Sequence, residues 1–283
     1  MATIDATQQE TLNFQEDGLQ IKYNFLSAEV ISKLRTECQN LFSHTQLMGP
    51  GYSIRLHKYV SEIPYPTAKL TSVNLLEVAI DIAEEIKKMG FVDYKFAHVA
   101  LYKEENNPKE LVWHSDMRNG GLIRAQICIQ GGDLKSGAFK YCKGTQKIAP
   151  TEPYPPAGFL AEHAKDIVTC DKPNGSLFLI NTLGYHSKCK CNETRISLMF
   201  DFLPSKHIQE TPNDCASDVL LTSSRLTDKV IENIELFRSG VSPLNSSVNT
   251  PDHYKFYKPL SGSNLKDMTT FAKNFIAKKV KRK

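Results

Sequence analysis

At 283 residues the chain is long enough to bury a sizeable core, and 41% hydrophobic with 23% charged residues is the composition of an ordinary globular protein. No apolar run approaches the roughly 20 residues that span a bilayer, and Met1 to Gln20 lacks the apolar core of a signal peptide. These features argue against a membrane span and lead us to expect a cytoplasmic location.

The basic character of the chain is confined to its C-terminal end. The segment from Lys273 to Lys283 holds six cations and no acid, and without it the formal net charge falls from +4 to −2. We expect a solvated helix end, where cations suit the helix macrodipole; contact with nucleic acid, a membrane or a targeting receptor is the alternative. The negative charge of the remaining chain argues against a nucleic-acid partner.

Two amphipathic helices are expected early in the chain, over Ser27–Phe42 and Asn74–Met89. In the first, Ser27 is a suitable N-cap and apolar residues recur at helical spacing. The second shows the same periodicity and ends at Gly90, because glycine favours the left-handed conformation found at helix ends.

From Tyr94 to Leu203 the pattern changes to short strands separated by turn signals. The expected strands are Lys95–Tyr102, Leu122–Gln130, Ala138–Cys142, Ile167–Cys170, Ser176–Ile180 and Arg195–Leu203. Many short strands favour an antiparallel sandwich or jelly roll. The proline-rich stretch Thr151–His163 is expected to form a long loop over one mouth of it, and helices are expected again near Ser224–Arg238 and Ser263–Lys281.

No internal repeat or low-complexity linker divides the chain, so we expect a single α+β domain over residues 1–283. Its core would cover about residues 94–203, with helical additions over 1–93 and 204–272 and the basic tail over 273–283. The seven cysteines are odd in number and scattered. We expect them to be reduced and structural, with Cys128 and Cys142 buried in strands; a zinc site at Cys189 and Cys191 would need a further pair nearby.

The most informative motif is His114-Ser115-Asp116. On an extended segment, residues two apart point to the same side, so both side chains can hold one ion. Alone the motif is weak, because such pairs arise by chance. His186, expected just after a strand, offers a third ligand. Two imidazoles and one carboxylate form the set that binds Fe(II) on one face and leaves the opposite face open.

Arg195 and Ser197 alternate with apolar residues along the last expected strand. One face is therefore polar and the other apolar, as in the wall of a barrel with a polar interior. Arginine forms a bidentate pair with a carboxylate, and a serine hydroxyl adds a hydrogen bond. Together with the metal ligands, this pattern indicates an iron oxygenase that uses 2-oxoglutarate. The alternative is a surface arginine with histidines buried in the core.

The stretch from Trp113 to Phe202 resembles the phytanoyl-CoA dioxygenase family of Fe(II)/2-oxoglutarate oxygenases. Beyond the His-x-Asp motif, Gly137–Gln146 is similar to the family's segment that ends in Pro-Gly-Ser/Thr-His, and Gly175–Ile180 is similar to its strand before the distal histidine. Trp113 to Asp116 is also similar to the ectoine hydroxylases of that family.

The chain departs from the family at several points. Lys143 replaces a usual proline and Gln146 a usual histidine, so the departure concerns the local loop and not the metal ligands. The acidic-aromatic stretch that follows the motif in ectoine hydroxylases is absent, so that substrate is not carried over. Related halogenases have a small residue in place of Asp116, so the carboxylate favours oxygenation.

The resemblance implies a double-stranded β-helix in which His114, Asp116 and His186 are the catalytic iron ligands, while Arg195 and Ser197 bind 2-oxoglutarate. With O2, the co-substrate would yield succinate and carbon dioxide. An unactivated C–H bond of a small polar metabolite would be hydroxylated, desaturated or used to close a ring.

Further candidates are weaker. Gln126 either contacts the co-substrate or is an exposed amide. Tyr102 either contacts the co-substrate or is a tyrosine of the core. Trp113 either walls the pocket or packs beneath the loop, and Arg118 and Arg124 either pair with an anionic substrate or are solvated. The remaining histidines that match no motif are expected to be structural: His57, His98, His163 and His207.

Two other functions stay open. One is a non-catalytic barrel that binds a small molecule or a partner protein, although such a barrel has no need of the complete ligand set. The other is an oxygenase that acts on a macromolecule through the basic tail. The sequence does not give the substrate, the oligomeric state, or the choice between hydroxylation and desaturation.

Overall fold

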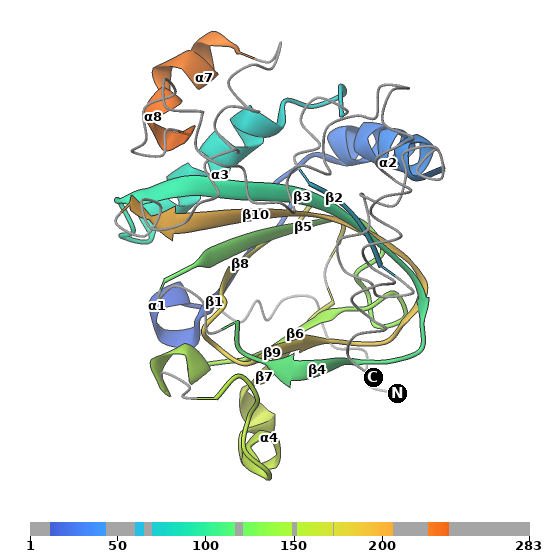
Figure 1. Cartoon of the computed structure of the whole chain (residues 1–283), viewed down its shortest axis with the longest axis vertical. Coiled ribbons are helices and arrows are strands. Elements are labelled where there is room, and N and C mark those ends of the chain that lie inside the picture. Colours follow the sequence, from blue (N-terminus) through green and yellow to red (C-terminus); the bar gives the residue numbers. More distant parts are fainter. Residues whose placement is uncertain are drawn as a thin grey trace, which may run out of the picture.

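Two antiparallel β-sheets face each other in the computed structural model of the chain (Figure 1), which describes residues 12–43, 60–64, 70–116, 121–148, 152–171, 173–205 and 226–237. The larger sheet has the order β1 (Leu19–Lys22), β8 (Leu177–Asn181), β5 (Ile123–Gln130), β10 (Cys191–Pro204), β3 (Tyr94–Asn107), β2 (Val60–Pro64). The smaller has the order β4 (Leu111–His114), β9 (His186–Lys188), β6 (Phe139–Cys142), β7 (Ile167–Cys170).

From β3 onward the chain passes back and forth between the sheets. The strands β3, β5, β8 and β10 belong to the larger sheet and β4, β6, β7 and β9 to the smaller, so only the β6–β7 connection stays within one sheet. Segments distant in sequence therefore become neighbours, and β4 pairs with β9 across some 70 residues of chain, with His114 opposite His186.

The main helices cover the outer face of the larger sheet, where α2 (Ala28–Ser43) and α3 (Leu75–Lys88) lie in Figure 1. Their apolar stripes pack on the outward strand residues in one buried cluster. Ser27 Oγ accepts the amide hydrogen of Val30, and Asn74 Oδ1 accepts that of Leu76, so both helices begin at side-chain caps.

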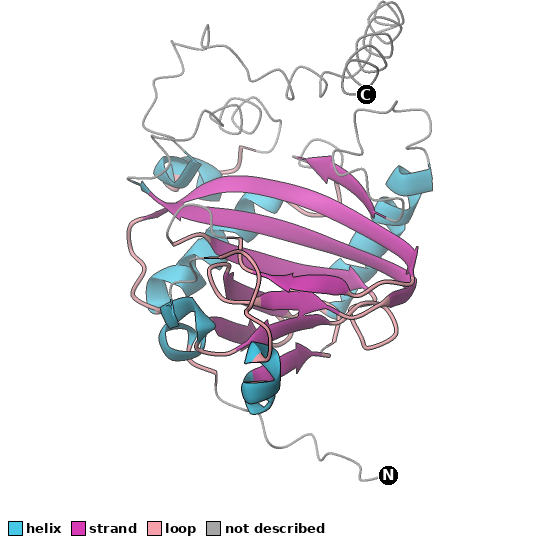
Figure 2. Cartoon of the chain, turned by 60° about the horizontal axis from the view of Figure 1, so that its bottom comes forward, coloured by secondary structure: helices cyan, strands magenta, loops and turns pink. Residues whose placement is uncertain are grey.

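Shorter helices lie around the sheets, again on the outside (Figure 2). They are α1 (Phe14–Asp17), α4 (Phe159–Glu162), α7 (Asp228–Glu232), α8 (Ile234–Phe237) and the 3-10 turns η4 (Thr145–Ile148) and η5 (Ala164–Asp166). Among the described helices, none is both long and apolar enough to cross a membrane.

The two faces of β10 have opposite character. Ile196, Leu198 and Phe200 are fully buried in the cluster beneath the helices. Arg195 and Ser197 lie on the other face, which looks into the space between the sheets, and their directly opposed neighbours on β3 are Glu104 and Tyr102. The polar–apolar alternation expected for this strand is confirmed.

The six expected strands and the two long N-terminal helices are present, with ends shifted by a few residues. Four short strands were missed: β1, β2, β4 and β9. The expectation of helices alone before residue 94 is wrong, because β1 and β2 extend both edges of the larger sheet. The Thr151–His163 segment contains α4, so it is not a loop throughout.

The expected helix near Ser224–Arg238 is two short ones, α7 and α8, separated at Asn233. The predicted helix Ser263–Lys281 and the basic tail fall outside the described residues. The described cysteines carry free thiols, as expected: Cys38, Cys128, Cys142, Cys170, Cys189 and Cys191. Cys128 and Cys142 are buried.

Candidate metal centre

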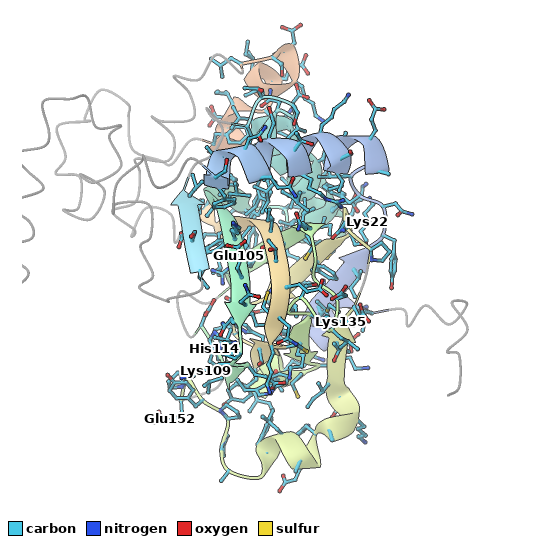
Figure 3. All side chains as sticks on the ribbon, turned by 90° about the vertical axis from the view of Figure 1, so that its right-hand side faces the viewer. Lys22, Glu105, Lys109, His114, Lys135 and Glu152 are labelled. Carbon is cyan, nitrogen blue, oxygen red and sulfur yellow. The ribbon has the colours of Figure 1, made fainter. Side chains whose placement is uncertain are left out.

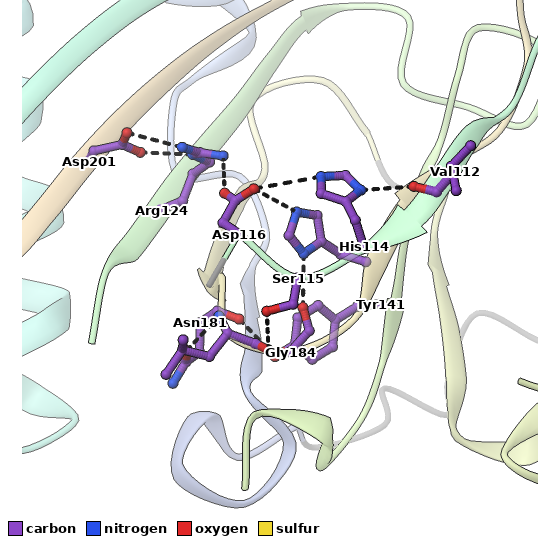
Figure 4. A network of polar contacts seen from close by, with 11 residues as sticks. Val112, His114, Ser115, Asp116, Arg124, Tyr141, Asn181, Gly184 and Asp201 are labelled. Atoms are coloured by element: carbon purple, nitrogen blue, oxygen red, sulfur yellow. Dashed lines mark hydrogen bonds and ion pairs between the residues drawn. The ribbon is translucent and has the colours of Figure 1, made fainter. Parts of the chain in front are cut away.

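Three side chains converge between the sheets: His114 from the end of β4, Asp116 two residues later, and His186 from the start of β9. One ligand atom from each lies within 4.8 Å of the other two. Asp116 Oδ1 is 3.6 Å from Nε2 of His114 and 3.9 Å from Nε2 of His186 (Figure 4). In Figure 3, His114 lies well away from α2, on the side of the smaller sheet.

Hydrogen bonds orient both imidazoles. His114 Nδ1 lies 2.8 Å from the carbonyl oxygen of Val112, and His186 Nδ1 lies 2.9 Å from that of Gly184. A carbonyl only accepts, so each Nδ1 carries a hydrogen, and Nε2 of each ring is the nitrogen that faces Asp116. Burial lowers the pKa of His186 to about 4, so this ring is neutral at pH 7. Neutral imidazoles with fixed tautomers are the form that binds a metal.

The turn before His186 forms hydrogen bonds with the segment that carries Asp116. Asp116 donates its amide hydrogen to the Thr182 carbonyl at 2.9 Å, and Ser115 Oγ donates to the Leu183 carbonyl at 2.8 Å. Beside this turn, the hydroxyl of the buried Tyr141 donates to the Asn181 carbonyl at 2.9 Å. A Cβ placed on Gly184 would lie 2.0 Å from that hydroxyl, so position 184 has no room for a side chain.

Arg124 on β5 joins Asp116 to Asp201 on β10 (Figure 4). Its Nη1 donates to Asp116 Oδ2 at 2.9 Å, while Nε and Nη2 donate to the two oxygens of Asp201 at 2.8 and 3.1 Å. Although desolvation opposes the charge, the two carboxylates raise the pKa of Arg124 above its ordinary value. Arg124 also lines the cavity beside these carboxylates and is only 22% exposed, so the interpretation as a solvated charge is wrong, whereas its pairing with an anionic substrate stays a prediction.

A cavity of about 150 Å³ opens beside the three ligands, lined by the other expected site residues, Arg195, Ser197, Gln126 and Tyr102. The first three are at least 96% buried, so the exposed-amide alternative for Gln126 is excluded. Gln126 Nε2 lies 3.6 Å from Cys128 Sγ, a weak contact that leaves the amide available to a ligand.

Arg195 is the cation at the other end of this cavity. Its Nη1 donates to the Gly137 carbonyl at 2.9 Å, but among the described residues its buried Nε has no hydrogen-bond partner. A buried donor without a partner is costly, especially on a charged group. A carboxylate beside Nε would supply the missing acceptor, so the observed environment fits an anionic ligand.

Two further charged residues line the same cavity and were not identified from the sequence: Glu104 on β3 and Lys188 on β9. They form an ion pair, and Asn107 Nδ2 also donates to Glu104 Oε1 at 2.6 Å. Burial lowers the pKa of Lys188, and Glu104 partly offsets that effect. Glu104 lies two residues after Tyr102 on β3, and Lys188 lies two residues after His186 on β9. Residues two apart on a strand share a face, so this spacing could have identified both residues from the sequence.

Three other sequence candidates, Trp113, His163 and Gln146, do not line this cavity. Lys140 Nζ sits 5.7 Å from the centre of the Trp113 ring. His163 stacks on Phe159 and lies 3.1 Å from an Asp166 oxygen, which supports a structural role. Gln146, the departure from the family pattern, donates to the Glu16 carbonyl at 3.0 Å and so ties η4 to α1. Arg118, His57 and His207 fall outside the described residues.

Solved structures share this fold. The epimerase SnoN, in complex with Fe3+, alpha ketoglutarate and nogalamycin RO, is 16% identical, with a TM-score of 0.55 over 68% of this chain and 81% of that one. EctD from S. alaskensis, with 2-oxoglutarate and 5-hydroxyectoine, is 16% identical, with a TM-score of 0.57 over 73% and 79%. The non-heme monooxygenase ThoJ, as a Ni complex, is 15% identical, with a TM-score of 0.52 over 69% and 76%.

No protein-family model matches the chain, and no curated protein matches it. At identities of 15–16% the structural similarity establishes a shared fold. The chemistry must be argued from the residues of this chain.

Proposed function

We propose that this protein is an Fe(II)/2-oxoglutarate-dependent oxygenase of the phytanoyl-CoA dioxygenase type, acting on a C–H bond of a small polar metabolite. The observation that carries the proposal is a single cavity with two complementary ends. One end has two imidazole nitrogens and a carboxylate oxygen within 4.8 Å of one another, and the other has a buried guanidinium whose Nε has no partner within the described ranges. The donor set suits Fe(II), and the guanidinium suits the distal carboxylate of a 2-oxo dicarboxylic acid.

Each residue has a defined part in this proposal. Nε2 of His114, Nε2 of His186 and Oδ1 of Asp116 hold the metal. Arg195 binds the distal carboxylate, with the Ser197 hydroxyl as a second donor and Gln126 and Tyr102 alongside. When bound, iron and 2-oxoglutarate supply oxidative decarboxylation by O2 to succinate and carbon dioxide, coupled to oxidation of the substrate C–H bond. The residues that line the cavity would orient the reactants and limit access of water.

The fold supports the same assignment. We infer that the two sheets are the halves of a double-stranded β-helix, since the strands from β3 to β10 alternate between them. SnoN and EctD have the same fold and are described with alpha ketoglutarate or 2-oxoglutarate bound. We retain a single domain over residues 1–283, and a cytoplasmic location, where the free thiols of the described cysteines stay reduced.

The test begins with anaerobic binding. The protein with Fe(II) and 2-oxoglutarate is expected to develop a weak visible charge-transfer band and, after oxygen is admitted, to release succinate even without a primary substrate. Pyruvate is a matched control ligand, because it keeps the 2-oxo acid and lacks the distal carboxylate. A protein that forms neither the band nor succinate would contradict the proposal, and equal binding of pyruvate would contradict the role of Arg195.

A further inference from the structure

The second oxygen of the metal-ligating carboxylate is already engaged. Asp116 Oδ1 faces both histidine nitrogens, whereas Oδ2 accepts a hydrogen bond from Arg124 Nη1 at 2.9 Å. We propose that Arg124 and Asp201 are positioning residues that restrict Asp116 to binding the metal through Oδ1 alone. This inference rests on the proposed metal site and concerns residues that do not themselves bind the metal.

Arg124 is held in place by its own partner. It lies directly opposite Asp201 in the register of β5 and β10, and two hydrogen bonds of 2.8 and 3.1 Å join the guanidinium to that carboxylate. The Arg124 and Asp201 side chains are 22% and 17% exposed, so water competes little for these bonds. Because the guanidinium is planar and two of its nitrogens are bonded to Asp201, the third, Nη1, is held facing Asp116. Asp201 does not itself line the cavity, so its effect on the metal site would act through Arg124.

The number of coordination positions explains why this restraint matters. An octahedral ion bound by two histidines and one carboxylate oxygen has three positions left. A 2-oxo acid that chelates the ion occupies two of them, so one remains open. If Asp116 bound through both oxygens, it would take that last position. By engaging Oδ2, Arg124 keeps the position open and also removes one rotational freedom from the ligand.

Charge and orientation predict opposite results when Arg124 is replaced. The positive charge of Arg124, next to the Asp116 carboxylate, repels a divalent metal ion bound there. If charge were the only effect, removing Arg124 should therefore tighten metal binding. Loss of orientation should weaken metal binding, and a free Oδ2 should alter the coordination. The direction of the change therefore separates a positioning residue from a charge that is merely nearby.

The experiment uses Co(II) alone as the probe, with calorimetry for affinity and the visible d–d spectrum for coordination. Arg124→Lys keeps the charge but cannot hold both carboxylates, and Arg124→Gln removes both the charge and the fork. The matched control is Arg35→Gln on α2, where the arginine donates to the Ile129 carbonyl and does not line the cavity. We expect about tenfold weaker Co(II) binding and an altered spectrum in both Arg124 variants, and wild-type values for the control.

Asp201→Asn provides a second route if the Arg124 variants fold poorly. It leaves Arg124 in place with one accepting oxygen, so about a threefold loss of Co(II) affinity is expected, with the far-ultraviolet circular dichroism unchanged. Equal or tighter Co(II) binding in the Arg124 variants, with the wild-type spectrum, would overturn the inference. If the wild-type protein itself binds no Co(II), the proposed metal site fails, and that result is distinct from variants that match a functional wild type.

Discussion

The two ends of the cavity differ in how completely their polar groups are satisfied. At the metal end, each Nδ1 has a carbonyl partner and the outer oxygen of Asp116 has Arg124. At the opposite end, Arg195 is buried beside the Glu104–Lys188 pair with its Nε unpaired. The metal ligands are thus organised before any ligand arrives, whereas Arg195 Nε has no hydrogen-bond partner in the part of the chain that the structure describes.

This difference assigns separate tasks to the two ends. Fixed tautomers and a fixed carboxylate reduce the reorganisation needed to bind a small cation, which favours affinity and geometry at the metal end. The buried Arg195 guanidinium lacks an acceptor for Nε, so it favours an anion that provides one. The other end of the cavity therefore determines which co-substrate binds. Changes at the metal end should therefore affect all ligands, and changes at the other end only the co-substrate.

The largest effect is expected from His186→Ala, which removes a ligand from the organised end. Metal affinity should fall by more than about 100-fold, because even the loss of a group that only orients a ligand costs tenfold to 100-fold. The iron–2-oxoglutarate charge-transfer band should disappear with it. Calorimetry with Co(II) and anaerobic absorption spectra give the two measurements.

His163→Ala is the matched control for this variant. Its ring stacks on Phe159 outside the cavity, so metal binding should remain at the wild-type level. Retention of wild-type metal affinity by His186→Ala would show that the two ends do not divide the work in this way.

Arg195→Met should separate the ends most cleanly. The affinity for 2-oxoglutarate should fall by about 100-fold, as for the loss of one partner of a buried charge pair, while the Co(II) affinity stays the same. The free energy of unfolding without ligand should change by no more than about 1 kcal/mol, because the variant also removes an unsatisfied buried donor. Ligand titration and urea denaturation measure these quantities. A comparable loss of metal affinity would mean that the ends are coupled.

Gly184→Ala tests the support beneath the organised end. The added Cβ would lie 2.0 Å from the Tyr141 hydroxyl and 3.1 Å from Thr145 Oγ1, so overpacking should cost about 2–3 kcal/mol in unfolding free energy. Metal affinity should fall as well, because the Gly184 carbonyl orients His186.

Gly144→Ala is its control. There a Cβ meets nothing closer than 4.0 Å, and only the left-handed backbone, with φ of 76°, costs about 1 kcal/mol. Equal losses in the two variants, measured by urea denaturation, would refute the steric argument at Gly184.

The sequence predicted one kind of feature well and another poorly. His114 and Asp116 were identified from their two-residue spacing, His186 from its position after an expected strand, and Arg195 from alternation along its strand. The structure brings the first three together, with their ligand atoms within 4.8 Å of one another. The Arg124–Asp201 pair was missed because it depends on the register between β5 and β10, which alternation within one strand does not specify. Strands of three to five residues, β1, β2, β4 and β9, were missed because they are too short to show a period.

Charged residues were the other source of error. One interpretation of Arg124 was a solvated charge, and Glu104 and Lys188 were not singled out at all. Most charges in proteins are exposed, so the burial of Glu104 and the partial burial of Arg124 and Lys188 are visible only once the sheets are packed together.

The smallest predicted effect is a pH dependence at the organised end. The pKa of His186 is about 4 in the folded protein, against 6.5 for the unperturbed side chain, because burial disfavours the charged ring. The unfolded state therefore binds more protons between these values. The stabilising contribution is complete above about pH 6.5 and is lost as the pH falls toward 4. Between pH 6 and 5, the metal-free wild-type protein should lose about 1 kcal/mol more unfolding free energy than His186→Gln. Urea denaturation of both proteins across this range measures the difference. Parallel pH profiles would show that the neutral imidazole contributes nothing to the organisation of the metal end.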